Sequence, residues 1–264
     1  MKHYEGRLGI FDYNEELWNL NQGYLKYIGP VIDGKIVGEI PEGVKDCIGM
    51  FKECKGLKQA PKIPKGIKSC FGMFHSCEDL EQAPEIPEGV ENCNWMFAYC
   101  TKLEQAPKIP EGVKECAGMF YGCSVLEQPP KIPESVKDCT GMFSNCESLK
   151  QASKLPKGIK ICFKMFENCK HLEQAPEILE GVKDCSWMFG FCESLKQPPK
   201  IHKSVKDYSW MFAGCKNLKQ IPEVPNKKAN VDNMFRECSK IKQEQKENQN
   251  QKQDNKMNSM NLFG

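Results

Sequence analysis

The sequence predicts an α/β solenoid of nine coils, each made of a short strand, a turn and a short helix. Three observations predict it: a strict repeat, an apolar spacing within each copy, and a turn signal before it. A Met-Phe pair returns every 23 residues without an insertion, at Met50, Met73, Met96, Met119, Met142, Met165, Met188, Met211 and Met234. One such unit cannot bury its own apolar side chains, so the units must stack in register.

The apolar spacing in each copy is typical of a helix. In the second copy, Cys70, Met73, Phe74, Cys77 and Leu80 follow the i, i+3, i+4, i+7 pattern of an amphipathic helix. A residue that favours a helix N-cap precedes this pattern in seven of nine copies: Asp46, Ser69, Asn92, Asp138, Asp184, Asp207 and Asn230. We therefore expect a helix of about two to three turns at every Met-Phe pair.

A turn signal precedes each expected helix. In Ile63-Pro64-Lys65-Gly66, Pro at the second position and Gly at the fourth favour a type I turn. Ser135 and Ser204 replace this Gly, which disfavours a type II turn because that turn requires Gly.

The segment before the turn, residues 58–63 in this copy, is expected to be extended. Pro61 and its equivalents lack an N–H group, so any β-ladder here is short or interrupted. Eight glutamines recur at one position: Gln59, Gln82, Gln105, Gln128, Gln151, Gln174, Gln197 and Gln220. Stacking would align them, either as an amide ladder or as a row exposed to water. Strands stack at about 5 Å and helices at about 10 Å, so the stack should curve with its helices outside.

The phrase L-x-x-A-P-x-I-P-x-G-V-x-D-C-x-x-M-F-x-x-C-x-x-L resembles the BspA-like leucine-rich repeat. Its V-x-D-x-x-x-M-F part resembles the related Met-Phe bacterial surface protein repeat. Typical matches are Leu57, Ile63, Phe74, Cys77, Leu80 and Val90, and the resemblance covers about residues 40–241. It implies a right-handed leucine-rich-repeat solenoid used for binding, often at microbial surfaces.

Two segments lie outside the repeat. Residues 1–38 alternate apolar and polar residues and contain Asp33-Gly34, a hairpin signal, which predicts a small β-rich cap on the first coil. Residues 242–264 are rich in Lys, Gln, Asn and Glu, which predicts a tail that is disordered or a loose helix. The predicted organisation is therefore a cap at 1–38, a solenoid at 39–241 and a tail at 242–264.

Composition and motifs exclude several classes of function. The formal net charge of +2 argues against a nucleic-acid partner, and no apolar run is long enough to insert into a membrane. The N-terminus has no apolar signal region, which predicts a cytoplasmic location; a cell-surface or secreted location is the alternative if a leader was removed. No nucleophile elbow, phosphate loop, dinucleotide fingerprint or zinc-protease helix occurs, so we expect no enzyme and no cofactor.

All sixteen cysteines lie in the repeats, seven at the Cys47 position and nine at the Cys54 position. There is no C-x-x-C pair and the four histidines are scattered, so no metal site is expected. Two cysteines of one helix would lie about 10.5 Å apart, beyond the reach of a disulfide. We expect buried free thiols that act as small apolar side chains, which fits a reducing compartment.

Departures from the repeat template identify candidate binding residues. The residue before Met is Gly in four copies but Trp in three, and bulky rings recur four residues later. Such rings are frequent binding anchors, so we predict a partner-binding site at Trp95, Tyr99, Tyr121, Trp187, Phe191 and Trp210. The alternative is that they pack over the neighbouring coil, where Gly leaves space.

These observations predict a non-catalytic protein–protein interaction scaffold whose partner and oligomeric state are unknown. A second hypothesis is a surface adhesin or carbohydrate-binding module that uses the rows of aromatic residues.

Overall fold

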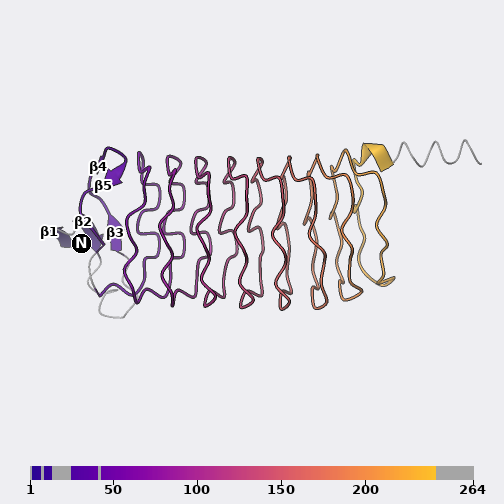
Figure 1. The fold of residues 1–264 in the computed structure, drawn as a ribbon, viewed down its shortest axis with the longest axis horizontal. Coiled ribbons are helices and arrows are strands. Elements are labelled where there is room, and N and C mark those ends of the chain that lie inside the picture. Colours follow the sequence, from indigo (N-terminus) through magenta and orange to yellow (C-terminus); the bar gives the residue numbers. More distant parts are fainter. Residues whose placement is uncertain (1, 7–8, 14–24, 41–42, 242–264) are drawn as a thin grey trace, which may run out of the picture.

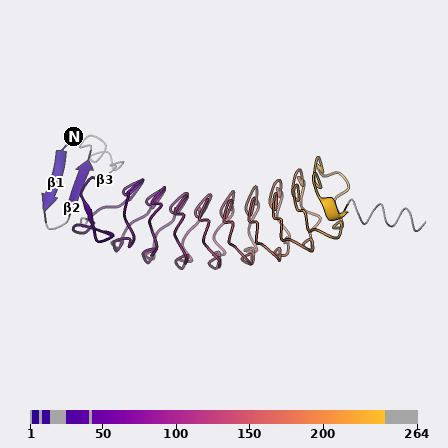
Figure 2. The same ribbon diagram turned by 90° about the horizontal axis from the view of Figure 1, so that it is seen from above.

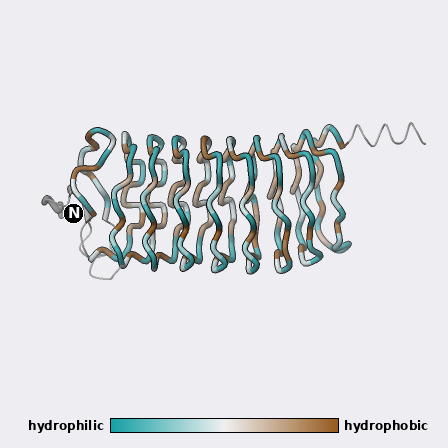
Figure 3. Tube along the Cα trace, viewed as in Figure 1, coloured by the Kyte–Doolittle hydropathy of each residue, from teal (hydrophilic) through white to brown (hydrophobic). Residues whose placement is uncertain are grey.

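A computed structural model describes residues 2–6, 9–13, 25–40 and 43–241 and shows a rod of stacked coils (Figure 1). The coils follow one another along the rod, from the N-terminal strands to the last coil. Hydrophobic and hydrophilic segments recur at similar places from coil to coil (Figure 3). The stacking predicted from the 23-residue period is therefore present.

All five strands of the described residues lie at the N-terminal end. β1 (Lys2–Gly6), β2 (Gly9–Tyr13) and β3 (Leu25–Tyr27) form an antiparallel sheet in the order β1-β2-β3, and β4 (Val31–Ile32) pairs with β5 (Lys35–Ile36). Asp33 and Gly34 join β4 to β5 with φ of 50° and 79°, the left-handed conformation that a type I′ hairpin turn requires. The predicted hairpin is therefore present. Residues 1, 7–8 and 14–24 of the expected cap, and the expected tail at 242–264, lie outside the described residues.

The N-terminal segment hydrogen-bonds to the first coil. The backbone N–H of Tyr27 donates to the carbonyl of Met50 at 2.9 Å, and the Tyr27 ring lies 5.5 Å from the Phe51 ring. The carbonyl of Gly34 accepts hydrogen bonds from the backbone N–H groups of Lys58 and Gln59. β3 therefore occupies the place that a preceding coil would take.

The predicted helices around the Met-Phe pairs are wrong. Within the described residues the only helical turn lies at 239–241. In the second coil the N–H groups of Met73 and Cys77 donate to the carbonyl three residues earlier, at 3.1 and 3.0 Å. Those of Gly72 and Phe74, on either side of Met73, donate across to the next coil, both at 2.9 Å. Each segment is thus a chain of tight turns whose alternate N–H groups bind the neighbouring coil.

Two left-handed residues in every coil explain this conformation. In the second coil they are Gly72, with φ of 55°, and Ser76, with φ of 58°, and the equivalent residues of all nine coils also have positive φ. An α-helix needs φ near −63° throughout. Successive tight turns advance about three residues each, so they bury the same i, i+3, i+4, i+7 positions as a helix would. Gly at the middle of four of these segments was the available signal, because Gly costs about 1 kcal/mol inside a helix.

The absence of helices on this side also corrects the expected curvature. Both sides of each coil now stack at strand-like spacing, and stacked phenylalanine rings of successive coils lie 5.4–5.9 Å apart. The rod is therefore only shallowly bowed (Figure 2).

The residues predicted as helix N-caps form a parallel ladder of β-bridges that runs from Asp46 through every coil to Asn230. Their side chains still act as caps, because Asp138 Oδ1 accepts the N–H of Thr140 at 2.8 Å. Asp207 accepts the N–H of Ser209 in the same way. The cap chemistry was predicted correctly, but it closes a turn and not a helix.

The turn at the I-P-x-G sequence lies one residue later than predicted. The N–H of Val90 donates to the carbonyl of Pro87, so Pro is the first residue of this turn and Gly89 the third. Gly89 has φ of 92°, as the third residue of a type II turn must, whereas Ser135 and Ser204 at the same position are not left-handed. Gly112 and Gly158 are not left-handed either, so the turn type varies from coil to coil and is not determined by Gly alone.

The eight glutamines are all exposed, and no hydrogen bond between their amides occurs in this described part of the chain. The row exposed to water is thus the correct alternative. Backbone bridges join Gln59 to Gln82 and Gln82 to Gln105, but they are missing at Gln128 and Gln197, each of which two prolines follow. A second Pro removes the N–H that the bridge needs, which explains the interrupted ladder.

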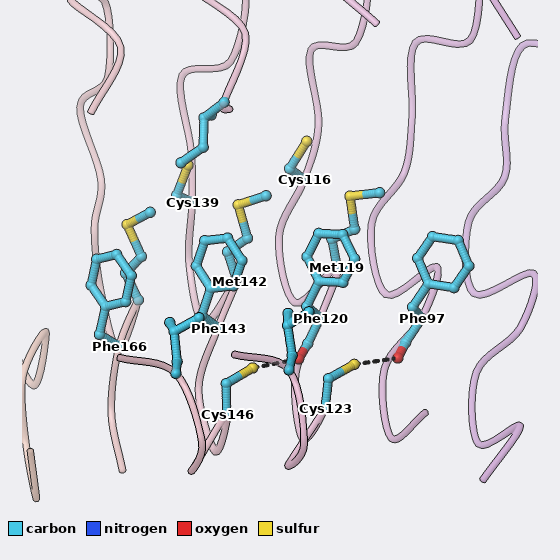
Figure 4. Packing of buried hydrophobic residues seen from close by; sticks show 14 of the residues in the cluster. Phe97, Cys116, Met119, Phe120, Cys123, Cys139, Met142, Phe143, Cys146 and Phe166 are labelled. Carbon is cyan, nitrogen blue, oxygen red and sulfur yellow. Dashed lines mark hydrogen bonds between the residues drawn. The ribbon is translucent and has the colours of Figure 1, made fainter. Parts of the chain in front are cut away.

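The core consists of columns that run the length of the rod. Nine phenylalanine rings from Phe51 to Phe235 stack with interplanar angles of 1–11°, beside a column of methionines (Figure 4). Because every ring packs on the next, each coil contributes the same apolar surface to both neighbours.

The sixteen cysteines are free, and all except the half-buried Cys54 are buried. From Cys77 onwards, each thiol at the Cys54 position donates to the carbonyl of the phenylalanine in the preceding coil, at 3.0–3.2 Å. Figure 4 shows two of these bonds, from Cys123 and Cys146. The column at the Cys47 position makes no such bond in the described structure and includes Tyr208 and Val231 in place of cysteine.

Candidate functional site

The six predicted binding residues lie on the Met-Phe side of the rod, in two separate groups. We call His75, Trp95, Tyr99 and Tyr121 the N-terminal aromatic cluster. We call Lys164, Trp187, Phe191, Trp210 and Arg236 the C-terminal aromatic cluster. The coil of Gly141 and Asn145, which has no aromatic residue in these positions, separates them along the sequence.

Five of the six predicted residues occupy left-handed positions. Trp95, Trp187 and Trp210 have φ of 57°, 57° and 59°, and Tyr99 and Phe191 have φ of 60° and 61°. This conformation costs a residue with a side chain roughly 1–2 kcal/mol, and four other coils avoid the cost with Gly before the Met. The contacts of these rings must therefore offset backbone strain.

Tyr121 joins the residues of the N-terminal cluster. Its ring lies 5.5 Å from the Trp95 ring and 5.2 Å from the Tyr99 ring, and Tyr99 lies 5.6 Å from His75. Trp95 also lies over the next coil, since a Cβ at Gly118 would be only 2.6 Å from its ring. The rings thus pack where Gly leaves space, as the alternative prediction stated, while Tyr99 keeps 42% of its surface exposed.

The C-terminal cluster is a continuous stack. The Trp187 and Trp210 rings are parallel, with centroids 4.7 Å apart, and Phe191 lies 6.0 Å from Trp187. Lys164 Nζ lies 5.3 Å from the Trp187 ring, and the Arg236 guanidinium lies 5.0 Å from the Trp210 ring. Both distances are typical of cation–π contacts.

Sequence reasoning identified the rings but missed their cationic neighbours and His75. The signal was present, because Lys164 occupies the same repeat position as the tryptophans. With turns in place of the expected helices, rings that lie four residues apart in the sequence do not share a helix face. Trp187 and Phe191 still meet, whereas Trp95 and Tyr99 each contact Tyr121 of the next coil.

The two titratable rings of the N-terminal aromatic cluster, His75 and Tyr99, favour their neutral forms. Burial lowers the pKa of His75, and the nearby Lys52 lowers it further. Burial raises the pKa of Tyr99, with a smaller contribution from Tyr121. In the core, burial raises the pKa of the Cys70 and Cys77 thiols to about 12, which keeps them protonated at neutral pH. A protonated buried thiol is neither a nucleophile nor a metal ligand.

No group of three or more His, Cys, Asp or Glu side chains in the described ranges could hold a metal ion. Over the same ranges, no helix has the length and apolar character needed to cross a bilayer.

A second surface consists of the exposed Gln-Ala-Pro segments. Shallow hollows lie along it, for example between Gln151, Ala152, Gln174 and Ala175.

Lysines and acidic residues of successive coils also form exposed ion pairs, such as Lys102 with Asp79 at 2.7 Å. Pairs of this kind contribute little stability individually, so this side acts mainly as a solvated surface.

Comparisons with known proteins agree with this architecture. The BspA type leucine rich repeat region, in six copies, matches residues 40–150, 71–183 and 140–260. The chain is similar to a solved leucine-rich repeat protein from Bacteroides ovatus ATCC 8483, with 22% identity and a TM-score of 0.57. That similarity covers 90% of this chain and 70% of the other, and it concerns the fold. A comparison with functionally curated proteins gave no match. The chain therefore belongs to the BspA-type leucine-rich repeat family.

Proposed function

We propose that this protein is a non-catalytic scaffold that binds another protein through its aromatic clusters. The observation that carries the proposal is the presence of bulky rings at left-handed positions, partly exposed on one side of a rod. The proposed architecture is a right-handed stack of nine coils with the β-rich N-terminal segment as its cap. The proposed location is the cytoplasm, because a reducing compartment suits so many free thiols.

The geometry of the clusters supports a binding role. Trp and Tyr are the residues that most often dominate protein interfaces, particularly when their positions are fixed before binding. Here each ring is held by the next coil, so little side-chain freedom remains to be lost on binding. Phe71 and Tyr99, each 42% exposed, add apolar surface on the same side of the rod.

A surface adhesin or carbohydrate-binding module is the second candidate, since half-exposed rings also offer flat faces to sugars. The proposed scaffold role is favoured because the polar groups beside the rings are already paired. Asn94, next to Trp95, donates to Glu115 at 2.9 Å and accepts the N–H of Ala117 at 2.7 Å.

Affinity capture with matched variants tests the proposal. The chain is immobilised and exposed to a lysate of the source organism, in parallel with a Trp187→Gly/Trp210→Gly variant. A Gln151→Ala/Gln174→Ala variant on the other surface is the control. We expect partner capture by the wild type and the Gln variant, and its loss in the Trp variant. Capture that survives the Trp variant but fails in the Gln variant would move the site to the Gln-Ala-Pro surface. Retention on immobilised oligosaccharides alone would favour the adhesin.

A further inference from the structure

Trp95 differs from Trp187 and Trp210 in having one indole face that the described residues leave uncovered. Its ring contacts Gly118 and Tyr121, which belong to the next coil. The preceding coils have Gly49 and Gly72 at the equivalent positions. Among the described residues, a Cβ at Gly49 would meet nothing within 4 Å, and one at Gly72 only the Cβ of His75 at 3.8 Å. We call the open surface over Gly49 and Gly72, bounded by Trp95, the glycine shelf.

The C-terminal cluster has no such opening. Lys164 covers the Trp187 ring from the preceding coil, and Trp210 covers it from the following coil. Trp210 lies in turn between Trp187 and Arg236. Only ring edges remain available there, so among the three tryptophans of the described residues a flat group can stack on a ring face only at the glycine shelf.

Apolar side chains flank the shelf, and the two charges at its rim are paired with each other. Phe71 and Ile48 precede the two glycines in the sequence, and Phe71 is 42% exposed. The charges at the rim, Lys52 and Glu53, pair with each other at 3.7 Å. His75 Nδ1 is within hydrogen-bond distance of Ser76 Oγ, at 2.9 Å. Few free polar groups therefore remain for the hydroxyls of a sugar or for a charged ligand.

We propose that the glycine shelf binds an uncharged segment of a protein partner by accepting a proline or aromatic ring against the open face of Trp95. This inference rests on the proposed scaffold function and names the part of the surface that recognises the partner. Proline and aromatic side chains bury apolar surface on a rigid ring without requiring polar partners. The shelf offers no unpaired charge to a ligand, and such a segment carries none, so this occupant fits the shelf.

The chain provides variants that close this shelf and open a second one. Gly72→Trp places an indole where three other coils already carry Trp, so it should fold and cover Trp95 as Trp187 covers Trp210. Lys164→Gly uncovers Trp187 and creates the same arrangement in the C-terminal cluster, because Phe163 precedes Lys164 as Phe71 precedes Gly72.

The probe is the acetylated, amidated peptide Pro-Pro-Phe-Pro-Pro, with chitotriose as the sugar comparator. Binding is followed by the indole N–H signals of the four tryptophans in ¹⁵N-labelled protein. We expect the peptide to shift the Trp95 signal and leave Trp187 and Trp210 unchanged. Gly72→Trp should weaken binding at least tenfold while circular dichroism shows that the protein stays folded, and Lys164→Gly should add a peptide-dependent shift at Trp187.

Several results would overturn the proposal. They are an unshifted Trp95 signal, equal shifts at Trp95, Trp187 and Trp210, a response to chitotriose but not to the peptide, or full binding by Gly72→Trp. A Trp95 signal that moves with protein concentration alone would assign the shelf to a second copy of the chain. If lysate capture depends on Trp210 while the shelf is silent, the scaffold function stands and this inference fails.

Discussion

The two cysteine columns should respond differently to serine. Cys139 and Cys146 lie in the same coil and are both fully buried, but only Cys146 donates its S–H, to the carbonyl of Phe120 at 3.1 Å. A serine at 146 retains this acceptor, whereas a serine at 139 buries a hydroxyl without one. An unsatisfied buried hydroxyl costs about 1–3 kcal/mol, so Cys139→Ser should destabilise the protein by about that much more than Cys146→Ser.

Urea unfolding followed by circular dichroism measures this difference. Both residues belong to one coil and therefore to one local unfolding unit, which makes the comparison internal even if the stack unfolds in steps. Alanine at each site is the control: Cys146→Ala should cost about 0.5–1 kcal/mol more than Cys139→Ala, the net contribution of one hydrogen bond. The Phe120 carbonyl stays paired in that variant, because the N–H of Cys123 also donates to it.

Equal destabilisation by the two serine variants would refute the reasoning. The invariance of the Cys54 column would then need an explanation other than its S–H bond.

Three further predictions concern strain, burial and pH. Gly118→Ala should destabilise the protein more than Gly49→Ala in thermal unfolding, and it should change Trp95 fluorescence. The two glycines have nearly the same φ, 60° and 59°, but only a Cβ at Gly118 meets a ring. Equal effects of the two substitutions would show that backbone strain alone matters. Tyr208→Phe should raise the free energy of unfolding by about 1 kcal/mol, because the Tyr208 hydroxyl is buried without a hydrogen-bond partner, and a loss of stability would contradict this. Burial raises the pKa of thiols such as Cys77 from 9.0 to about 12, so the unfolded state releases their protons first. The contribution of these thiols to the free energy of unfolding is complete below pH 9. It falls as the pH rises from 9 towards 12, by about 1.4 kcal/mol per pH unit for each thiol. Urea midpoints that stay constant over this range would contradict the burial of the thiols.

The sequence predicted the columns of the core but not the backbone that builds them. Phe74 and Cys77 were placed in the core by their recurrence, and both are fully buried. The apolar spacing could not distinguish a helix from a chain of tight turns, because both bury the same positions. Ser76 gave no warning either. Helices tolerate serine, so the residue type does not reveal its left-handed φ.

The candidate site was predicted in its members but not in its contacts. Trp187 and Trp210 stood out as departures from the repeat, and they do stack on each other. The pairing of Lys164 and Arg236 with these rings could not be predicted, because it depends on a stacking distance that helices would have doubled. With turns in place of helices, residues 23 positions apart become direct neighbours.

A directional rule follows for this repeat. Rings at the left-handed positions lean towards the next coil, so a glycine that follows an aromatic residue by 23 positions receives its ring. Gly118 receives Trp95, and Gly122 receives Tyr99 in this way. A glycine that precedes an aromatic residue by 23 positions leaves the other face open, as Gly72 does for Trp95. The order of Gly and Trp along one column therefore determines whether a tryptophan is sealed within the stack or has a face available to a partner.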